Sequence, residues 1–327
     1  MGWNRPEATG VRALTHDAAL ERHPTMTDEA EMRTRLSILA IPLLVAGCVG
    51  AGGGGNPSGS TAPPTAPSTI PTYSVETGSN KLILRLSIDG GLMAPGYFMI
   101  RTPTVALYGD GRVIVGGPVI AIYPGPLLPN LRQLHVTPAE IQKILAAADA
   151  DGLLGPDASY MATDIMDAGT TTFTTIVDGK THSIGAYALS EAGTIDNAAV
   201  TAARAKLLDF SHKFTDLAKF LGRTLSDAEA YAPTEMRVFT GPVPTADPAF
   251  PNPQVVTWPL TVNPTSGQGT THPGVKCLAI SGADLTAFLK VSTGANSLTV
   301  WTAPSGRFSV SVRPLYPDES GCPVTAS

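Results

Sequence analysis

The stretch "TTTFTTIVDGKTHSIGAYAL", residues 170–189, decides the fold class. Two runs rich in threonine, a residue that favours strands, flank Asp178-Gly179. Aspartate and glycine tolerate the positive φ that a tight hairpin turn requires, so we predict two antiparallel strands joined at this dipeptide. Helices predicted on either side of this hairpin in the sequence must then pack against a sheet.

Two further stretches share this design. "TVALYGDGRVIVGG", residues 104–117, turns at Gly109-Asp110-Gly111, and "SLTVWTAPSGRFSVSVRPL", residues 297–315, turns at Pro304-Ser305-Gly306. The alternating run Lys81–Ile88 predicts another strand, and "VVTWPL" and "GVKCLAI" predict two more late in the chain.

Helix signals separate these hairpins. Thr137, Pro138 and Glu140 form a capping-box pattern that predicts a helix start, and Gly152 marks its end. A second amphipathic helix is predicted from about 197 to 221, and the spacing of Ser281 and Asp284 predicts a short third one. The expected apolar faces of the first two comprise Ile141, Ile144, Leu145 and Ala148, then Ala203, Leu207, Phe210, Phe214, Leu217 and Leu221.

Together these elements predict an α+β fold, in which antiparallel sheets built from hairpins are each covered by one or two helices. We expect an α+β domain over residues 73–231 and a β-rich domain over residues 232–327. Residues 240–254, "TGPVPTADPAFPNPQ", contain too many prolines for a regular element. They form either a linker or a surface loop that contacts something.

The N-terminal region carries a different signal. From Met32 the chain reads "MRTRLSILAIPLLVAGC", with two arginines, an apolar run and small residues before Cys48. These are the three parts of a secretory signal peptide, and the apolar run is too short to span a bilayer, which takes about 20 residues. We therefore predict a signal peptide over residues 32–47, and we interpret the polar residues 1–31 as an upstream start assigned too early.

Residues 48–72 follow with glycine, serine, threonine and proline and no charge. Such a segment cannot bury enough apolar surface to fold, so it predicts a tether. Its r.m.s. reach is roughly 25–30 Å.

The composition limits the classes of partner and indicates the redox state of the compartment in which the protein works. Charged residues make up 15% of the chain and the net charge is −5, without a long basic run, which argues against nucleic acid as a partner. Cysteines occur only at positions 48, 277 and 322. If Cys48 carries a lipid, Cys277 and Cys322 remain as an even pair, which predicts a disulfide rather than two free thiols or a zinc site.

Sequence patterns of catalysis are scarce. We find no metalloprotease, nucleophile-elbow, dithiol or phosphate-loop motif, and the histidines after Cys48 lack ligand spacing, so we predict no enzyme, no cofactor and no metal. The carboxylate pairs Asp164/Asp167 and Asp318/Glu319 are typical of loop caps. Trp258 and Trp301 could line a binding groove or belong to the core.

Val45-Ala46-Gly47-Cys48 resembles the lipobox of bacterial lipoproteins. With "YGDGRVI" (108–114), "DAGTTTF" (167–173), "WPL" (258–260) and "RPLYPDESGC" (313–322), the chain resembles a family of uncharacterised actinobacterial secreted lipoproteins. That resemblance implies a lipid on Cys48 and an envelope location. Residues 81–222 also resemble the small emfourin-type inhibitors of metalloproteases in the order of their elements.

These observations predict a lipid-anchored protein on the extracytoplasmic face of the cell membrane. The membrane is its partner through the lipid on Cys48, and an envelope protein is a possible second partner. We expect a non-catalytic binding or scaffolding module; the alternatives are an inhibitor of a secreted metalloprotease and an envelope hydrolase with an unrecognised site.

Overall fold

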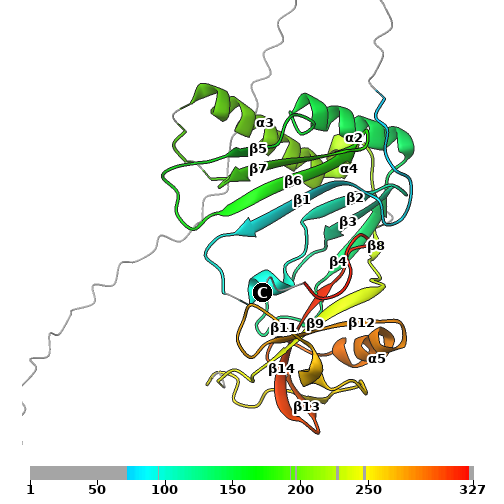
Figure 1. Cartoon of the computed structure of the whole chain (residues 1–327), viewed down its shortest axis with the longest axis vertical. Helices are drawn as coiled ribbons and strands as arrows, with labels where there is room; N and C mark the ends of the chain where they lie inside the picture. The colour runs from blue at the N-terminus through cyan, green and yellow to red at the C-terminus, as the bar shows by residue number, and fades with distance from the viewer. Residues whose placement is uncertain are drawn as a thin grey trace, which may run out of the picture. The chain divides into compact units, whose positions relative to one another are not determined.

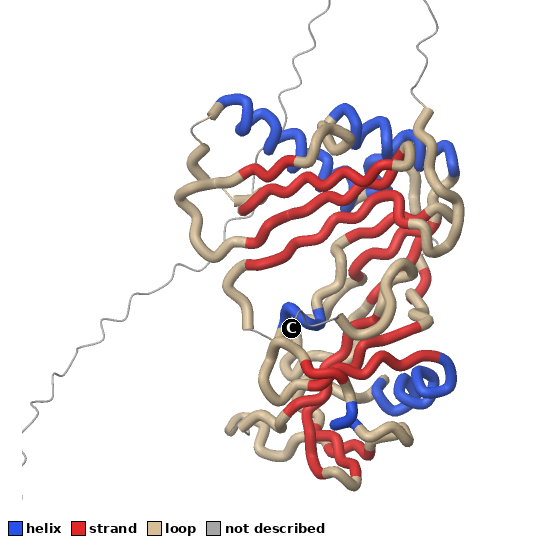
Figure 2. Tube along the Cα trace, in the orientation of Figure 1, coloured by secondary structure: helices blue, strands red, loops and turns tan. Residues whose placement is uncertain are grey.

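A computed structural model describes residues 72–323, except residues 95, 192, 196, 226–227 and 246–247. These residues lie within one compact unit, Ala66–Ser327, which holds two β-sheets (Figures 1 and 2). The α+β prediction is confirmed. Cys48, the predicted signal peptide and nearly all of the predicted tether lie outside the described residues.

The first sheet has eight strands in the order β5-β7-β6-β1-β2-β3-β4-β8. Their bounds are β1 Leu82–Gly90, β2 Val105–Tyr108, β3 Arg112–Gly116, β4 Leu131–His135, β5 Ala158–Tyr160, β6 Gly169–Val177, β7 Lys180–Tyr187 and β8 Glu229–Ala230. The hairpins predicted at Gly109-Asp110-Gly111 and at Asp178-Gly179 are β2–β3 and β6–β7. Asp178 and Gly179 adopt φ of 51° and 70°, which is why this dipeptide forms the turn.

The second sheet has six strands in the order β10-β13-β14-β9-β12-β11. Their bounds are β9 Glu235–Gly241, β10 Val255–Thr257, β11 Gln268–Gly269, β12 Lys276–Ser281, β13 Val300–Ala303 and β14 Gly306–Pro314. The predicted hairpin at Pro304-Ser305-Gly306 is β13–β14. Two strand pairs, β5–β7 and β10–β13, are parallel, so the sheets are not built from hairpins alone.

Helices α2 (Pro138–Ala150), α3 (Ala198–Thr215) and α4 (Leu217–Leu221) cover one face of the first sheet (Figure 1). The capping box of α2 is confirmed, because Thr137 and Glu140 each accept a hydrogen bond from the other's backbone N–H. The hydrogen bond from Arg223 is the main reason that the pKa of Glu140 falls to about 2. The four residues predicted for the apolar face of α2 are all buried.

The predicted helix over 197–221 is two helices. Asp216 leaves the helical conformation, with φ −119° and ψ 65°, and its side chain caps α4 at the N–H of Lys219. The stripe also differs at its start, where Arg204 is buried instead of Ala203. The Arg204 guanidinium donates to the carbonyls of Tyr160, Tyr187 and Ala188, and these hydrogen bonds compensate the cost of burying its charge. The spacing of apolar residues in the sequence does not reveal these partners.

One face of the second sheet packs against α5 (Gly282–Ser292) around an aromatic cluster. Trp301 is fully buried and stacks on Phe288 with ring centroids 5.5 Å apart, and Trp258 meets both rings edge-on. Ser281 occupies the N-cap of α5 as predicted, but its side chain makes no capping hydrogen bond, so that part of the prediction is wrong.

The C-terminal tail, residues 315–323, links the two sheets. Tyr316 is buried against Ala106, Tyr108 and Ile114, on the face of the first sheet away from the helices, and donates to the carbonyl of Pro103. Asp318 accepts from Arg85 at 2.6 Å and from Tyr108 at 2.7 Å.

The tail is also fixed to the second sheet. Glu319 pairs with Arg313 of β14 at 2.6 Å, Gly321 donates to Glu235 of β9, and Cys322 forms a disulfide with Cys277 of β12. The predicted cysteine pairing is therefore present in the structure, where it covalently joins the tail to a strand.

Candidate functional site

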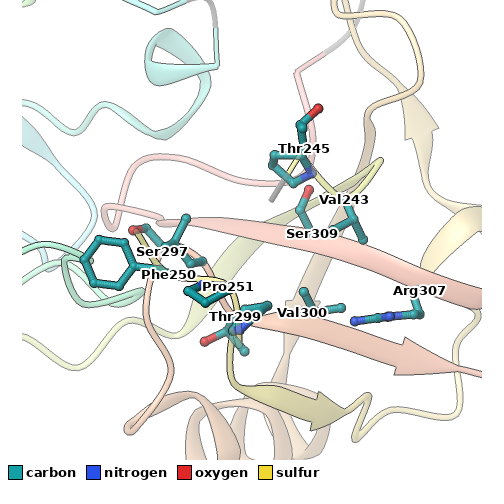
Figure 3. A pocket seen from close by; sticks show the side chains of 12 residues that line it. Val243, Thr245, Phe250, Pro251, Ser297, Thr299, Val300, Arg307 and Ser309 are labelled. Atoms are coloured by element: carbon teal, nitrogen blue, oxygen red, sulfur yellow. The ribbon is translucent and has the colours of Figure 1, made fainter. Parts of the chain in front are cut away.

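The candidate site is a groove on the face of the second sheet opposite α5 (Figure 3). Its volume is about 420 Å³, within the range of pockets that hold small ligands. One wall is formed by the described residues of the proline-rich loop, 242–245 and 248–254; the other is formed by residues 297–300 and by β14. The lining residues are Val243, Pro244, Thr245, Phe250, Pro251, Pro253, Ser297, Leu298, Thr299, Val300, Arg307 and Ser309.

Strand register explains why these side chains face the groove. Val300 of β13 pairs with Ser309 of β14, so both point to one face of the sheet. Trp301 and Phe308, the next pair along the hairpin, point to the opposite face and into the aromatic core. Period-two alternation thus separates the groove from the core that supports it.

Hydrogen bonds fix both ends of the proline-rich loop to this hairpin. Ser309 Oγ donates to the carbonyl of Pro242 at 2.9 Å, and the Val300 N–H donates to the carbonyl of Gln254 at 2.8 Å. Thr299 Oγ1 donates to Gln254 Oε1 at 3.0 Å. These hydrogen bonds fix the two ends of the wall before any ligand arrives, and each described proline also fixes its own φ.

The chemistry of the groove is apolar with one cationic end. Phe250 and Arg307 lie at opposite ends in the view of Figure 3, with valine and proline side chains between them. Arg307 is exposed and has no ion-pair partner among the described residues. None of the described lining residues is a histidine, cysteine, aspartate or glutamate. The groove can therefore hold an apolar body and neutralise an acidic group, and its described lining offers no carboxylate or imidazole for proton transfer.

The Phe250 end of the groove touches a second loop. Tyr123, from the loop of residues 117–130 between β3 and β4, meets the Phe250 ring edge-on with centroids 5.2 Å apart. This loop was not predicted from sequence as part of a site. Its composition was the one feature of the sequence that could have indicated an unusual loop: its fourteen residues include four prolines and no charged residue.

The two tryptophans considered for a groove belong to the core. Trp258 is 7% exposed and Trp301 0%, and both lie in the cluster beneath the sheet. Their role is to support the hairpin that carries the groove.

Three of the four carboxylates in these pairs stabilise a loop or the tail, whereas Asp167 contributes its backbone carbonyl, which accepts from the Leu92 N–H at 2.9 Å. Asp164 accepts from the N–H and the hydroxyl of Thr194, and these hydrogen bonds lower the pKa of its carboxyl. Asp318 and Glu319 hold the tail as described above. Burial raises the pKa of Tyr108, and its hydrogen bond to Asp318 raises it further.

The histidines are dispersed. His182 Nδ1 lies 2.8 Å from the carbonyl of Gly155, His272 contacts Thr271, and His212 lines a charged hollow beside Lys213 on α3. No group of three or more metal-ligating side chains occurs within residues 72–323 as described. Across the same residues, no helix combines the length and apolarity needed to cross a membrane.

Comparisons with known proteins return no relative. No family model matches the chain. No curated protein and no solved structure matches it either.

Proposed function

We propose that this protein is a lipid-anchored binding module on the extracytoplasmic face of the cell membrane, which holds a small amphipathic acid in the groove. The observation that carries the binding role is the groove itself: an apolar channel with Arg307, which forms no ion pair with the residues described, at the end opposite Phe250. The anchor is supported by the sequence around Cys48 and by the Cys277–Cys322 disulfide, a bond typical of oxidising compartments.

Arg307 favours an acid over a neutral amphiphile. A charge-assisted hydrogen bond to a carboxylate is stronger than a neutral one, and no described carboxylate competes for this guanidinium. The walls contribute by removing apolar surface of the ligand from water, at roughly 25 cal/mol per Å². Because hydrogen bonds hold Pro242 and Gln254 at the two ends of the loop, less of this free energy is lost to ordering the site.

The binding role is tested with dodecanoate and the chain from residue 49 onward, by titration calorimetry. We expect a single site with a dissociation constant on the order of 10–100 μM. Val243→Asp should weaken binding at least about tenfold, because it places a charge in the apolar wall. Arg307→Gln should weaken binding by about fivefold, since this exposed cation is partly screened by solvent.

Val255→Asp is the matched control. Val255 is 56% exposed on the neighbouring strand β10 and does not line the groove, so this variant should bind dodecanoate as the unaltered chain does. If the Val243 and Arg307 variants also bind normally, or if dodecan-1-ol binds as tightly as the acid, the proposed site is wrong.

The anchor is tested by Cys48→Ala in an actinobacterial host fed an alkyne analogue of palmitate. We expect the unaltered protein to be labelled and recovered with membranes, and the variant to lose the label. Cys277→Ala/Cys322→Ala is the control: it removes the other two cysteines and should keep the label. An unlabelled parent protein in the soluble fraction would contradict the anchor.

A further inference from the structure

The first half of the 117–130 loop exposes a run of apolar side chains. Val119 is 82% exposed, Ile120 62%, Ile122 56% and Tyr123 60%. Pro118 and Ala121, between and beside them, are exposed as well. We call residues 118–123 the apolar tip.

The loop is held in place at its base. The Gly117 N–H donates to the carbonyl of Asn130 at 2.7 Å, and Asn130 Nδ2 donates to the carbonyl of Pro118 at 2.8 Å. Further along, Leu127 donates to Ala295, and Ser297 donates to Gly125. The tip thus projects from a base that is closed by hydrogen bonds between its own ends and is bonded to the connection between α5 and β13, so its exposure is a property of the fold.

Moving this tip from water into a hydrocarbon layer would desolvate few polar groups. No residue of the 117–130 loop is charged, and its four prolines have no N–H to desolvate. The Ile122 N–H is already bonded to the carbonyl of Ile120 at 3.0 Å. The tyrosine suits a membrane interface, where one end of the side chain is apolar and the other is hydrated.

The size of the tip argues against a folded protein as its partner. The four large side chains offer on the order of 500 Å², whereas a stable protein interface buries about 800 Å² from each partner. A fluid hydrocarbon layer closes around a protruding loop and needs no matching surface. The sequence also places Cys48 only 24 residues before Thr72, where the described chain begins, so the proposed lipid on Cys48 would keep the folded unit close to a bilayer.

We propose that the apolar tip inserts into the surface of a phospholipid bilayer and orients the folded unit on it. The choice of a bilayer rests on the proposed lipid anchor, but insertion is a property of the tip and needs no covalent lipid. Through the contact of Tyr123 with Phe250, insertion places the Phe250 end of the groove near the headgroups, where amphipathic acids concentrate.

Insertion is tested by flotation of the chain from residue 49 onward with phosphatidylcholine vesicles. Without Cys48 this chain cannot carry the lipid, so the result is independent of the anchor. We expect it to float with the vesicles to nearly the same extent at about 0.1 M and 1 M salt, because the contact is apolar. The double variant Ile120→Asp/Ile122→Asp should lower the partition coefficient at least about tenfold.

Met161→Asp is the matched control, since Met161 is 56% exposed, as Ile122 is, but lies outside the tip. It should float like the unaltered chain, and near-ultraviolet circular dichroism should show all variants folded. Failure of the unaltered chain to float, or equal flotation of the Ile120/Ile122 variant, would overturn the proposal. So would a lipid-free dimer that the double aspartate variant dissociates, because the tip would then join two copies of the chain.

The two proposals fail in distinguishable ways. If the anchor is wrong, the unaltered protein takes up no alkyne label while vesicle flotation persists. If the insertion is wrong, the labelled protein remains with membranes while the anchor-free chain does not float.

Discussion

Removing the disulfide between Cys277 and Cys322 is expected to lower the free energy of unfolding by roughly 4 kcal/mol. The two residues are 45 positions apart, and a crosslink across a loop of that length removes conformational entropy from the unfolded chain. For a unit of this size the loss corresponds to a fall in melting temperature of roughly 10 °C.

Besides the disulfide, the tail makes other native contacts. Arg237 Nε donates to the carbonyl of Gly321 at 2.6 Å, and Arg313 and Glu319 form an ion pair at 2.6 Å. Tyr231 donates to the carbonyl of Leu315 at 2.7 Å, and burial raises its pKa to about 12, so the phenol stays protonated at neutral pH. We therefore expect the folded structure of the variant to resemble the parent and the effect to act mainly through the unfolded state.

The measurement is urea unfolding of Cys277→Ala/Cys322→Ala beside the parent chain, each with and without a reducing agent. The reduced parent should unfold near the variant, and the variant should not respond to the reductant. A parent whose unfolding midpoint is the same in both conditions would show that the bridge does not form in solution.

Trp301→Ala is expected to destabilise the protein by about 3–5 kcal/mol. The indole is fully buried, stacked on Phe288 with an interplanar angle of 17° and met edge-on by Trp258 at 6.1 Å. Alanine removes these contacts and leaves a cavity that the surrounding rings can fill only in part. Because the same hairpin carries Val300 and Arg307, groove binding should weaken in the same variant.

Trp301→Phe separates volume from aromatic stacking. It keeps a ring against Phe288 and should recover more than half of the lost stability. In the chain from residue 49 onward it also leaves Trp258 as the sole tryptophan, so its fluorescence reports directly on this core during urea unfolding. Phe250→Ala is the surface comparison: Phe250 is 36% exposed, so the loss should stay near 1 kcal/mol or below. An equal loss in Trp301→Ala and Phe250→Ala would contradict the assignment of Trp301 to the core.

Several elements were predictable because their causes are local. The turn at Asp178-Gly179 needs only two residues that accept positive φ, and the Thr137–Glu140 capping box spans three positions. The pairing of Cys277 with Cys322 followed from the count of cysteines once Cys48 was assigned to a lipid. The boundaries of the two predicted domains, the lipid and the envelope location stay predictions.

Other features depend on which segments the fold brings together. Tyr108 and Asp318 are 210 positions apart, and Tyr316 reaches Pro103 across 213, so no local pattern indicates that the tail lies between the two sheets. The parallel pairs β5–β7 and β10–β13 were unpredictable for the same reason, since the propensity of a segment to form a strand does not specify which strand it pairs with.

The sequence by itself determined the secondary structure around the hairpins, the helix start at Thr137 and the composition of the two proline-containing loops. Only the tertiary structure decided that one loop forms the wall of a groove, that the other exposes an apolar tip, and that Tyr123 and Phe250 join them. The physical reason is range: turns and caps arise from bonded neighbours, whereas a groove and an exposed tip are defined by which distant side chains do, or do not, cover them.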